Sequence, residues 1–207
     1  MKILKILILP IIFIITIIII NITKDNRIYY IPIGDKGYST YIKNFLDKNN
    51  KLKYYTDEFT YKNIRIKDLI LKIEDNEEKS ISIQNAINKS DIITISIGLD
   101  EIYTKYLTNE LDYRYIDELI SYINNLLNII KKISNSKIYL LGYYNPTDNI
   151  ELDKYIKYAN NKLKNINNVI YIDLYDIFKN NKHLIYNNIY PNNDGYKLIA
   201  NKIIKNM

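Results

Sequence analysis

The chain has 207 residues, of which 47% are hydrophobic and 25% charged, a composition that excludes intrinsic disorder and fits one folded domain. It has no cysteine, which excludes disulfides, a thiolate nucleophile and a lipid-modified cysteine, and its single histidine, His183, excludes a multi-histidine metal site. The net charge of +6 arises from lysines interleaved with acidic residues rather than from a one-sided stripe, so we do not expect nucleic-acid binding.

The N-terminal segment, residues 1–24, starts with Lys2 and Lys5 and continues as a nearly unbroken apolar run to Ile20. Basic residues before an apolar run are typical of a signal peptide or signal anchor, and a span needs about 20 residues. No small-residue cleavage site follows, so we expect an uncleaved, single-pass transmembrane helix; a cleaved signal and a secreted protein are the alternative. The leading positive charge predicts that residues 25–207 form a domain on the extracytoplasmic side of the cell membrane.

Beyond this segment, strand-like runs alternate with amphipathic stretches. In chain order we expect a strand at 28–33, a helix at 38–46, a strand at 52–55, helices at 64–73 and 83–87, a strand at 91–98, a helix at 113–133, a strand at 137–142, a helix at 152–163, a strand at 169–173 and a helix at 195–204. The clearest strand is 91–98, because a nearly continuous β-branched run suits a parallel strand that is buried on both faces.

This alternation predicts an α/β fold, a three-layer sandwich with a roughly five-stranded parallel sheet and helices on both faces. Ligands of such folds bind at the carboxyl ends of the strands. We therefore expect the polar segments that follow the strands to meet at one rim. The candidate binding residues on this rim are Gly34, Asp35, Gly98, Glu101, Tyr143, Tyr144 and Asn145.

Four of these segments carry a resemblance to a known family. They are residues 33–36 (Ile-Gly-Asp-Lys), 96–101 (Ser-Ile-Gly-Leu-Asp-Glu), 142–146 (Gly-Tyr-Tyr-Asn-Pro) and 189–196 (Ile-Tyr-Pro-Asn-Asn-Asp-Gly-Tyr). In this order they resemble sequence blocks of the SGNH, or GDSL, hydrolase family of esterases and lipases. The resemblance implies a flavodoxin-like sheet and an active site with a serine nucleophile, a histidine base oriented by aspartate, and donors for an oxyanion.

The residues at the catalytic positions of these blocks differ from the family's. Lys36 stands where the nucleophilic serine would be, Asp100 where the oxyanion asparagine would be, Asn188 where the orienting aspartate would be, and Tyr190 where the histidine would be. The glycine of the second block has no counterpart. An ionised Asp100 has no proton to donate to an oxyanion, and a tyrosine with an ordinary pKa near 10 is a poor base at neutral pH.

Other functions for these residues remain open. Tyr143 and Tyr144 could stack on a carbohydrate, and Asp35 could join the acidic residues of the 96–101 segment, Asp100 and Glu101, around Mg²⁺ or Ca²⁺. Ser39 could act as a relocated nucleophile with His183 as base. We prefer a structural interpretation for each of these groups, and we expect no metal and no cofactor.

The expected function follows from these replacements. We expect a membrane-tethered, extracytoplasmic SGNH hydrolase-like protein that is catalytically degenerate and acts as a binding or structural module, with an ester or a glycan as the kind of ligand. The alternative is an active esterase or lipase-type hydrolase of esters or acetylated glycans that uses non-standard residues. An assay of ester hydrolysis separates the two.

Overall fold

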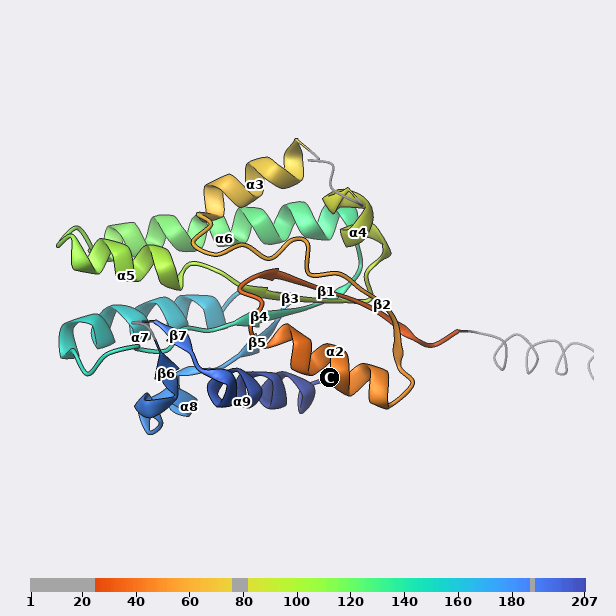
Figure 1. Cartoon of the computed structure of the whole chain (residues 1–207). Coiled ribbons are helices and arrows are strands. Elements are labelled where there is room, and N and C mark those ends of the chain that lie inside the picture. The colour runs from red at the N-terminus through yellow and green to blue at the C-terminus, as the bar shows by residue number, and fades with distance from the viewer. Residues whose placement is uncertain (1–24, 76–81, 187–188) are drawn as a thin grey trace, which may run out of the picture.

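The computed structural model describes residues 25–75, 82–186 and 189–207, which contain a five-stranded parallel sheet (Figure 1). Its strands lie in the order β2-β1-β3-β4-β5, and a short antiparallel pair, β6 with β7, lies apart from it. The strands are β1 (Ile28–Gly34), β2 (Leu52–Tyr55), β3 (Ile92–Ser96), β4 (Lys137–Leu141), β5 (Ile170–Ile172), β6 (Ile185–Tyr186) and β7 (Tyr190–Pro191). The predicted parallel α/β sheet is thus confirmed.

Helices cover both faces of this sheet. In Figure 1, α3, α4, α5 and α6 lie on one side, and α2 and α9 lie on the other. The helices are α2 (Ser39–Lys48), α3 (Ile66–Glu74), α4 (Ile83–Lys89), α5 (Leu99–Leu107), α6 (Tyr113–Ile133), α7 (Ile150–Lys164), α8 (Tyr175–Lys179) and α9 (Asn193–Ile204), with a short 3₁₀ turn at Lys182–Leu184. The result is three layers with an apolar core on each face of the sheet.

The two cores explain why the strands are so apolar. One core joins the sheet to the apolar sides of α3, α4, α6 and α7, and the other joins it to α2, α8 and α9. The first four residues of β3 are buried, as the continuous β-branched run predicts. In the second core the buried Thr94 hydroxyl meets the hydroxyls of Tyr30 at 3.0 Å and Tyr38 at 3.1 Å, so these polar groups are satisfied.

Side-chain caps set where several helices begin. The Asp112 carboxylate accepts a hydrogen bond from the Tyr115 amide at 2.6 Å at the start of α6, and Asn149 accepts from the Glu151 and Leu152 amides at the start of α7. The long helix α6 then buries an apolar stripe at helical spacing, as the sequence predicts.

Several short elements differ from the expectations. Helix α8 and the β6–β7 pair were not predicted, because elements of a few residues carry little periodic signal, and helix α5 was not predicted because Gly98 was read as the end of a strand. Within the described residues, no helix combines the length and apolar character needed to cross a membrane. The predicted anchor falls in residues 1–24, outside the described part of the chain.

Candidate functional site

The predicted site segments meet at the carboxyl ends of β1 and β3. In the order β2-β1-β3-β4-β5, these two strands flank the point where the strand order reverses, which is where open α/β sheets bind ligands. Directly after β1, the Asp35 amide donates to the Ser96 carbonyl at 2.9 Å. The loops that follow both strands are therefore tied to each other at this point.

Two glycines make this close approach possible. Gly34 has φ of +91°, and a Cβ there would lie 1.9 Å from the Ser96 carbonyl oxygen. Gly98 has φ of +98° at the start of α5, and a Cβ there would lie 2.4 Å from the Tyr143 hydroxyl oxygen. Both positions need left-handed backbone and free space, which only glycine supplies. These two predicted rim residues thus fix the backbone of the site, and Gly98 also lines its cavity.

Tyr190 and Asp100, predicted at two catalytic positions, are in direct contact. The Tyr190 hydroxyl lies 2.8 Å from Asp100 Oδ1 and 2.6 Å from Asn63 Oδ1. A phenol has one proton, so it donates to one of these acceptors at a time. Burial, followed by the neighbouring Asp100 carboxylate, raises the pKa of Tyr190 well above its ordinary value. The hydroxyl therefore stays protonated at neutral pH and joins β7 to the first turn of α5 and to the loop that follows β2.

The sequence did not point to Asn63 as a member of this contact. Asn63 lies in the loop after β2 and has φ of 55°, the left-handed conformation that glycine and asparagine tolerate best. The chain lacks a glycine for the second family block, and Asn63 supplies left-handed backbone in this loop. Its separation of 127 residues from Tyr190 left no local signal of their contact.

Asp35 lies deeper in the same site. Its Oδ1 accepts from the Tyr196 hydroxyl at 3.3 Å and from the Gly37 amide at 3.3 Å. Burial raises the pKa of Asp35, and the negative charge of Asp100 raises it further. Burial likewise raises the pKa of Asp100, against the lowering effect of the hydrogen bond from Tyr190. Both carboxylates thus lie in an environment that disfavours their charge.

Lys36, at the position of the family's nucleophile, is directed elsewhere. Its side chain is 64% exposed, and its ammonium group pairs with the Asp57 carboxylate at 3.4 Å. It does not line the cavity that Asp35, Asp100 and Tyr190 share. Asn188, at the position of the orienting aspartate, lies outside the described residues.

The remaining predicted rim residues serve as structure. Tyr143 and Tyr144 are buried, and their hydroxyls donate to the backbone carbonyls of Ile97 at 3.0 Å and Ile189 at 2.5 Å. A buried ring cannot stack on a carbohydrate, so Tyr143 and Tyr144 do not form the suggested stacking surface. Asn145 is also buried, and its side chain holds the loop before α7 by bonding to the Asn149 carbonyl and the Thr147 amide.

Glu101 caps a helix instead of facing a ligand. Its carboxylate accepts from the Ile66 amide at 2.8 Å, at the start of α3, and from the Tyr115 hydroxyl at 3.4 Å. Burial raises the pKa of Glu101 above its ordinary value. Among the described residues, no three His, Cys, Asp or Glu side chains converge as a metal site would require, so the proposed Asp35, Asp100 and Glu101 cluster is not assembled.

The proposed Ser39–His183 pair is not formed either. Ser39 is fully buried, and its hydroxyl bonds to the Lys36 carbonyl at 2.7 Å and the Tyr55 hydroxyl at 2.9 Å. His183 is exposed in the 3₁₀ turn of residues 182–184. A serine that sequence reasoning missed, Ser96, lines the cavity beside Asp35, and no described histidine is hydrogen-bonded to its hydroxyl.

The cavity at the centre of this site is small. Its volume is about 40 Å³, and its walls include Asp35, Asp100, Tyr144 and Tyr190. Such a space holds at most a few water molecules. Ligand pockets for small molecules commonly measure about 300 to 1,000 Å³. The carboxylates and phenols therefore fill the site largely with one another.

Comparison with solved structures identifies the architecture. A lipolytic protein of the G-D-S-L family from Veillonella parvula superposes with a TM-score of 0.62 at 16% identity, over 85% of this chain and 96% of that one. The esterase EstA from Pseudoalteromonas sp., inhibited by monoethylphosphonate, gives 0.56 at 11% identity, over 85% and 94%. The catalytic domain of peptidoglycan O-acetyltransferase A from Streptococcus pneumoniae gives 0.53 at 12% identity, over 85% and 90%.

The chain has the SGNH hydrolase fold. The sequence prediction of this architecture is thus confirmed, and identities this low concern the fold alone. No protein-family model matches the sequence, and no curated protein sequence matches it.

The fold allows the predicted catalytic positions of this chain to be compared with those of the SGNH family. In that family a serine follows β1 and a histidine lies in the loop before the last helix. Lys36, which the sequence predicts at the serine position, is exposed and pairs with Asp57, and Tyr190, predicted at the histidine position, is hydrogen-bonded to Asp100. Among the described residues, no histidine lines the cavity.

Proposed function

We propose that this protein is a membrane-tethered, extracytoplasmic domain of the SGNH hydrolase fold that no longer performs acyl transfer and acts as a binding or structural module. One observation carries the proposal. The side chain at the position of the catalytic base, Tyr190, is used as a bridge between Asp100 and Asn63. A group that joins a strand, a helix and a loop in this way contributes to the fold, whereas a general base must be free to take a proton.

The electrostatics of the site support the loss of acyl-transfer chemistry. Tetrahedral intermediates of acyl transfer carry a negative oxygen that needs hydrogen-bond donors. Asp100, at the oxyanion position, offers carboxylate oxygens, and Asp35 adds a second carboxylate within the same cavity. An ionised carboxylate is an acceptor only and repels a developing negative charge. This arrangement would destabilise the transition state that the family's site stabilises.

The size of the site supports the same conclusion. A cavity of about 40 Å³ is far below the volume that a small-molecule substrate occupies. Tyr190 and the buried Tyr143 and Tyr144 are among the residues that line it. A ligand of this domain would therefore bind on the surface of the strand-end loops rather than enter the cavity.

An ester-hydrolysis assay tests this proposal. The purified full chain is incubated with p-nitrophenyl acetate and p-nitrophenyl butyrate, and nitrophenol release is compared with that of a heat-unfolded sample. We expect equal rates for the two samples, because no described residue activates a nucleophile. Release by the folded chain that a serine-directed phosphonate abolishes would contradict the proposal.

The alternative function is an active hydrolase with non-standard residues, and one observation favours it. Ser96 is a serine that lines the same cavity as Asp35. If the chain hydrolyses esters, the Ser96→Ala variant should lose the activity, whereas Ser39→Ala, which alters a hydroxyl bonded to the Lys36 carbonyl, should retain it.

The tether is proposed from the N-terminal segment, where basic residues precede an apolar run to Ile20. Protease treatment of intact protoplasts tests the proposed location. An extracytoplasmic domain is digested while a cytoplasmic marker survives. A domain that stays protected until the protoplasts are lysed would contradict this part of the proposal.

A further inference from the structure

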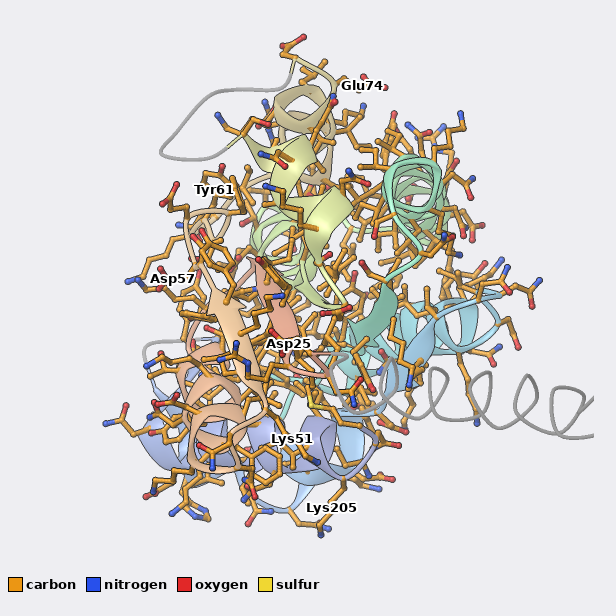
Figure 2. All side chains as sticks on the ribbon, turned by 90° about the vertical axis from the view of Figure 1, so that its right-hand side faces the viewer. Asp25, Lys51, Asp57, Tyr61, Glu74 and Lys205 are labelled. Carbon is orange, nitrogen blue, oxygen red and sulfur yellow. The ribbon has the colours of Figure 1, made fainter. Side chains whose placement is uncertain are left out.

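The edge of the sheet where the strands begin carries a feature that the proposed function does not use. A depression of about 730 Å³ lies there, lined by the start of β1, the segments before β3 and β4, and the C-terminal Met207. Figure 2 looks onto this edge and shows Asp25, Lys51 and Lys205 on it. The edge lies opposite the carboxyl-end site, and the described chain enters the domain here at Asp25.

Exposed lysines gather around this depression. Lys51, Lys89 and Lys137 line it directly, and other lysines stand at the ends of neighbouring helices. The full set, which we call the basic edge, is Lys48, Lys51, Lys89, Lys132, Lys137 and Lys205. Within the described parts of the chain, none of these lysines forms an ion pair with a carboxylate. Their positive charges are therefore available to a partner.

The acidic side chains beside the depression form ion pairs or hydrogen bonds within the domain. Asp25 pairs with Arg27 at 3.0 Å and with Lys53 at 3.2 Å, and the Asp91 carboxylate accepts from the Tyr29 amide at 2.8 Å. Asp47 neighbours Lys48 and offsets part of the charge, and Glu74 lies at the far end of this face in Figure 2. The region around the chain entry therefore remains positively charged.

Helix-end chemistry explains only part of this set. Lysine in the last turn of a helix interacts favourably with the helix dipole, which accounts for Lys48, Lys89 and Lys132. The helix dipole does not account for Lys51 and Lys137, because Lys51 directly precedes β2 and Lys137 is the first residue of β4. Their position beside the depression has no such local explanation.

The length of chain between the proposed anchor and β1 limits how far this edge can lie from the membrane. The apolar run ends at Ile20, and β1 begins at Ile28. Even fully extended, the connecting chain spans at most roughly 28 Å, at about 3.5 Å per residue. If residues 1–20 span a bilayer, this short connection lets the basic edge approach the membrane surface to within a Debye length, about 8–10 Å, where its charges are not screened. Clusters of lysine close to a membrane anchor attract anionic lipid head groups.

From this arrangement we infer that the basic edge docks on anionic phospholipid head groups and holds the carboxyl-end site away from the membrane. The inference rests on the tether in the proposed function. It adds an orientation, because the chain entry at Asp25, the depression and the lysines of the basic edge lie on one side and the Tyr190 site lies on the other. Any ligand of the domain then reaches it from the solvent side.

Fluorescence quenching in vesicles tests this orientation. The chain has no cysteine, so single-cysteine variants accept one label each. Asn135→Cys places a fluorophore in the depression, and Ile150→Cys places one at the start of α7 on the opposite edge. The full chain is reconstituted into phosphatidylcholine vesicles with or without phosphatidylglycerol, each with a lipid that carries a quencher on its head group.

We expect quenching of the label at position 135 in the vesicles with phosphatidylglycerol, with loss of the effect at high salt, and no quenching at position 150. The triple variant Lys51→Gln, Lys89→Gln and Lys137→Gln should lose the quenching. The matched control with Lys62→Gln, Lys154→Gln and Lys179→Gln, exposed lysines away from the depression, makes the same change in net charge and should retain it.

Flotation of the same samples after an alkaline wash separates the two proposals. A chain that floats with the vesicles but shows equal quenching at positions 135 and 150 would overturn the orientation and leave the tether intact. A chain that does not float would contradict the tether, and the orientation with it. Equal effects of the two triple variants would show that net charge, rather than the basic edge, is responsible, and would also overturn the inference.

Discussion

At the scale of single residues, the central feature is the phenol of Tyr190. Its hydroxyl lies within hydrogen-bond distance of Asp100 and Asn63, from segments that follow two different strands. A histidine at this place would be oriented toward a nucleophile, whereas the tyrosine is held by two acceptors and keeps its proton. In the proposed function this phenol holds β7 against α5 and the loop that contains Asn63.

Removal of this hydroxyl should weaken the fold. We expect Tyr190→Phe to lower the free energy of unfolding by about 1–2 kcal/mol, because the change leaves partly buried acceptors on Asp100 and Asn63 without their donor. Urea unfolding followed by circular dichroism measures this difference. Tyr113→Phe is the control, since that ring is 47% exposed and should change stability by less than about 0.5 kcal/mol. Equal effects of the two variants would show that the bridge is not stabilising.

Asp35 predicts a pH dependence of stability. Burial raises its pKa in the folded protein above the ordinary value of 3.8, so the folded state holds the proton more tightly than the unfolded state. The group therefore lowers stability as the pH rises from the unfolded pKa through the folded one, and it has no such effect below both.

We expect Asp35→Asn to remove this loss while its amide oxygen still accepts from Tyr196 and Gly37. The free energy of unfolding of the variant should fall less than that of the wild type between about pH 4 and neutrality. Urea titrations at a series of pH values measure both curves. Parallel curves would contradict the assignment of a raised pKa to this carboxyl.

At the scale of elements, the junction of β1 with β3 decides where the site forms. Gly34 and Gly98 let the two strands end in left-handed turns, and the Asp35 amide then bonds to the Ser96 carbonyl across the junction. The strand pairing from Tyr30 with Ile92 to Gly34 with Ser96 continues up to this point. The backbone of this junction therefore sets the position of the site.

A methyl group at Gly34 should disrupt this junction. Gly34→Ala would put its Cβ 1.9 Å from a backbone oxygen and force an L-residue to φ of +91°, so we expect a loss of roughly 3 kcal/mol in the free energy of unfolding. Gly37→Ala is the comparison, because its obstacle is the Tyr196 side chain and its φ is not in the left-handed region. Thermal unfolding should show the larger loss for Gly34→Ala, and the reverse order would contradict this account of the junction.

Sequence reasoning found the elements that carry a strong periodic signal. The β-branched run of β3 and the long apolar stripe of α6 depend on burial alone, and both were predicted from their patterns. Helix α5 was missed because Gly98 was taken as the end of a strand, whereas its left-handed backbone also starts a helix. The two-residue strands β6 and β7 are formed by a tertiary pairing that has no period in the sequence.

The candidate site was predictable in place but not in detail. The rule that strand ends meet at one edge predicted Asp35 and Asp100 together, and the family resemblance added Tyr190, which lines the same cavity. The rule could not tell that Tyr143 and Tyr144 are buried, because a tyrosine whose hydroxyl finds a carbonyl partner is stable inside or outside. Nor could it find Asn63, whose contact with Tyr190 exists only in the folded chain.

At the scale of the whole molecule, two edges of the sheet carry different chemistry. The small cavity lined by carboxylates and phenols lies at the carboxyl ends of the strands. The chain entry and the lysines of the basic edge lie at the opposite ends. The SGNH fold explains why these lie apart, since all strands of the main sheet run in one direction. Under the proposed function, one edge of the sheet faces solvent and the other serves for attachment.

Reaction of the intact chain with a serine-directed fluorophosphonate, followed by mass spectrometry, tests the central claim most directly. It reports an activated serine without any assumption about the substrate. We predict that the mass of the folded chain stays unchanged, because no described base is hydrogen-bonded to Ser96 and the buried Ser39 hydroxyl is bonded to Tyr55 and a carbonyl. A phosphonyl adduct on a single serine that disappears when the chain is unfolded before the reaction would contradict the account.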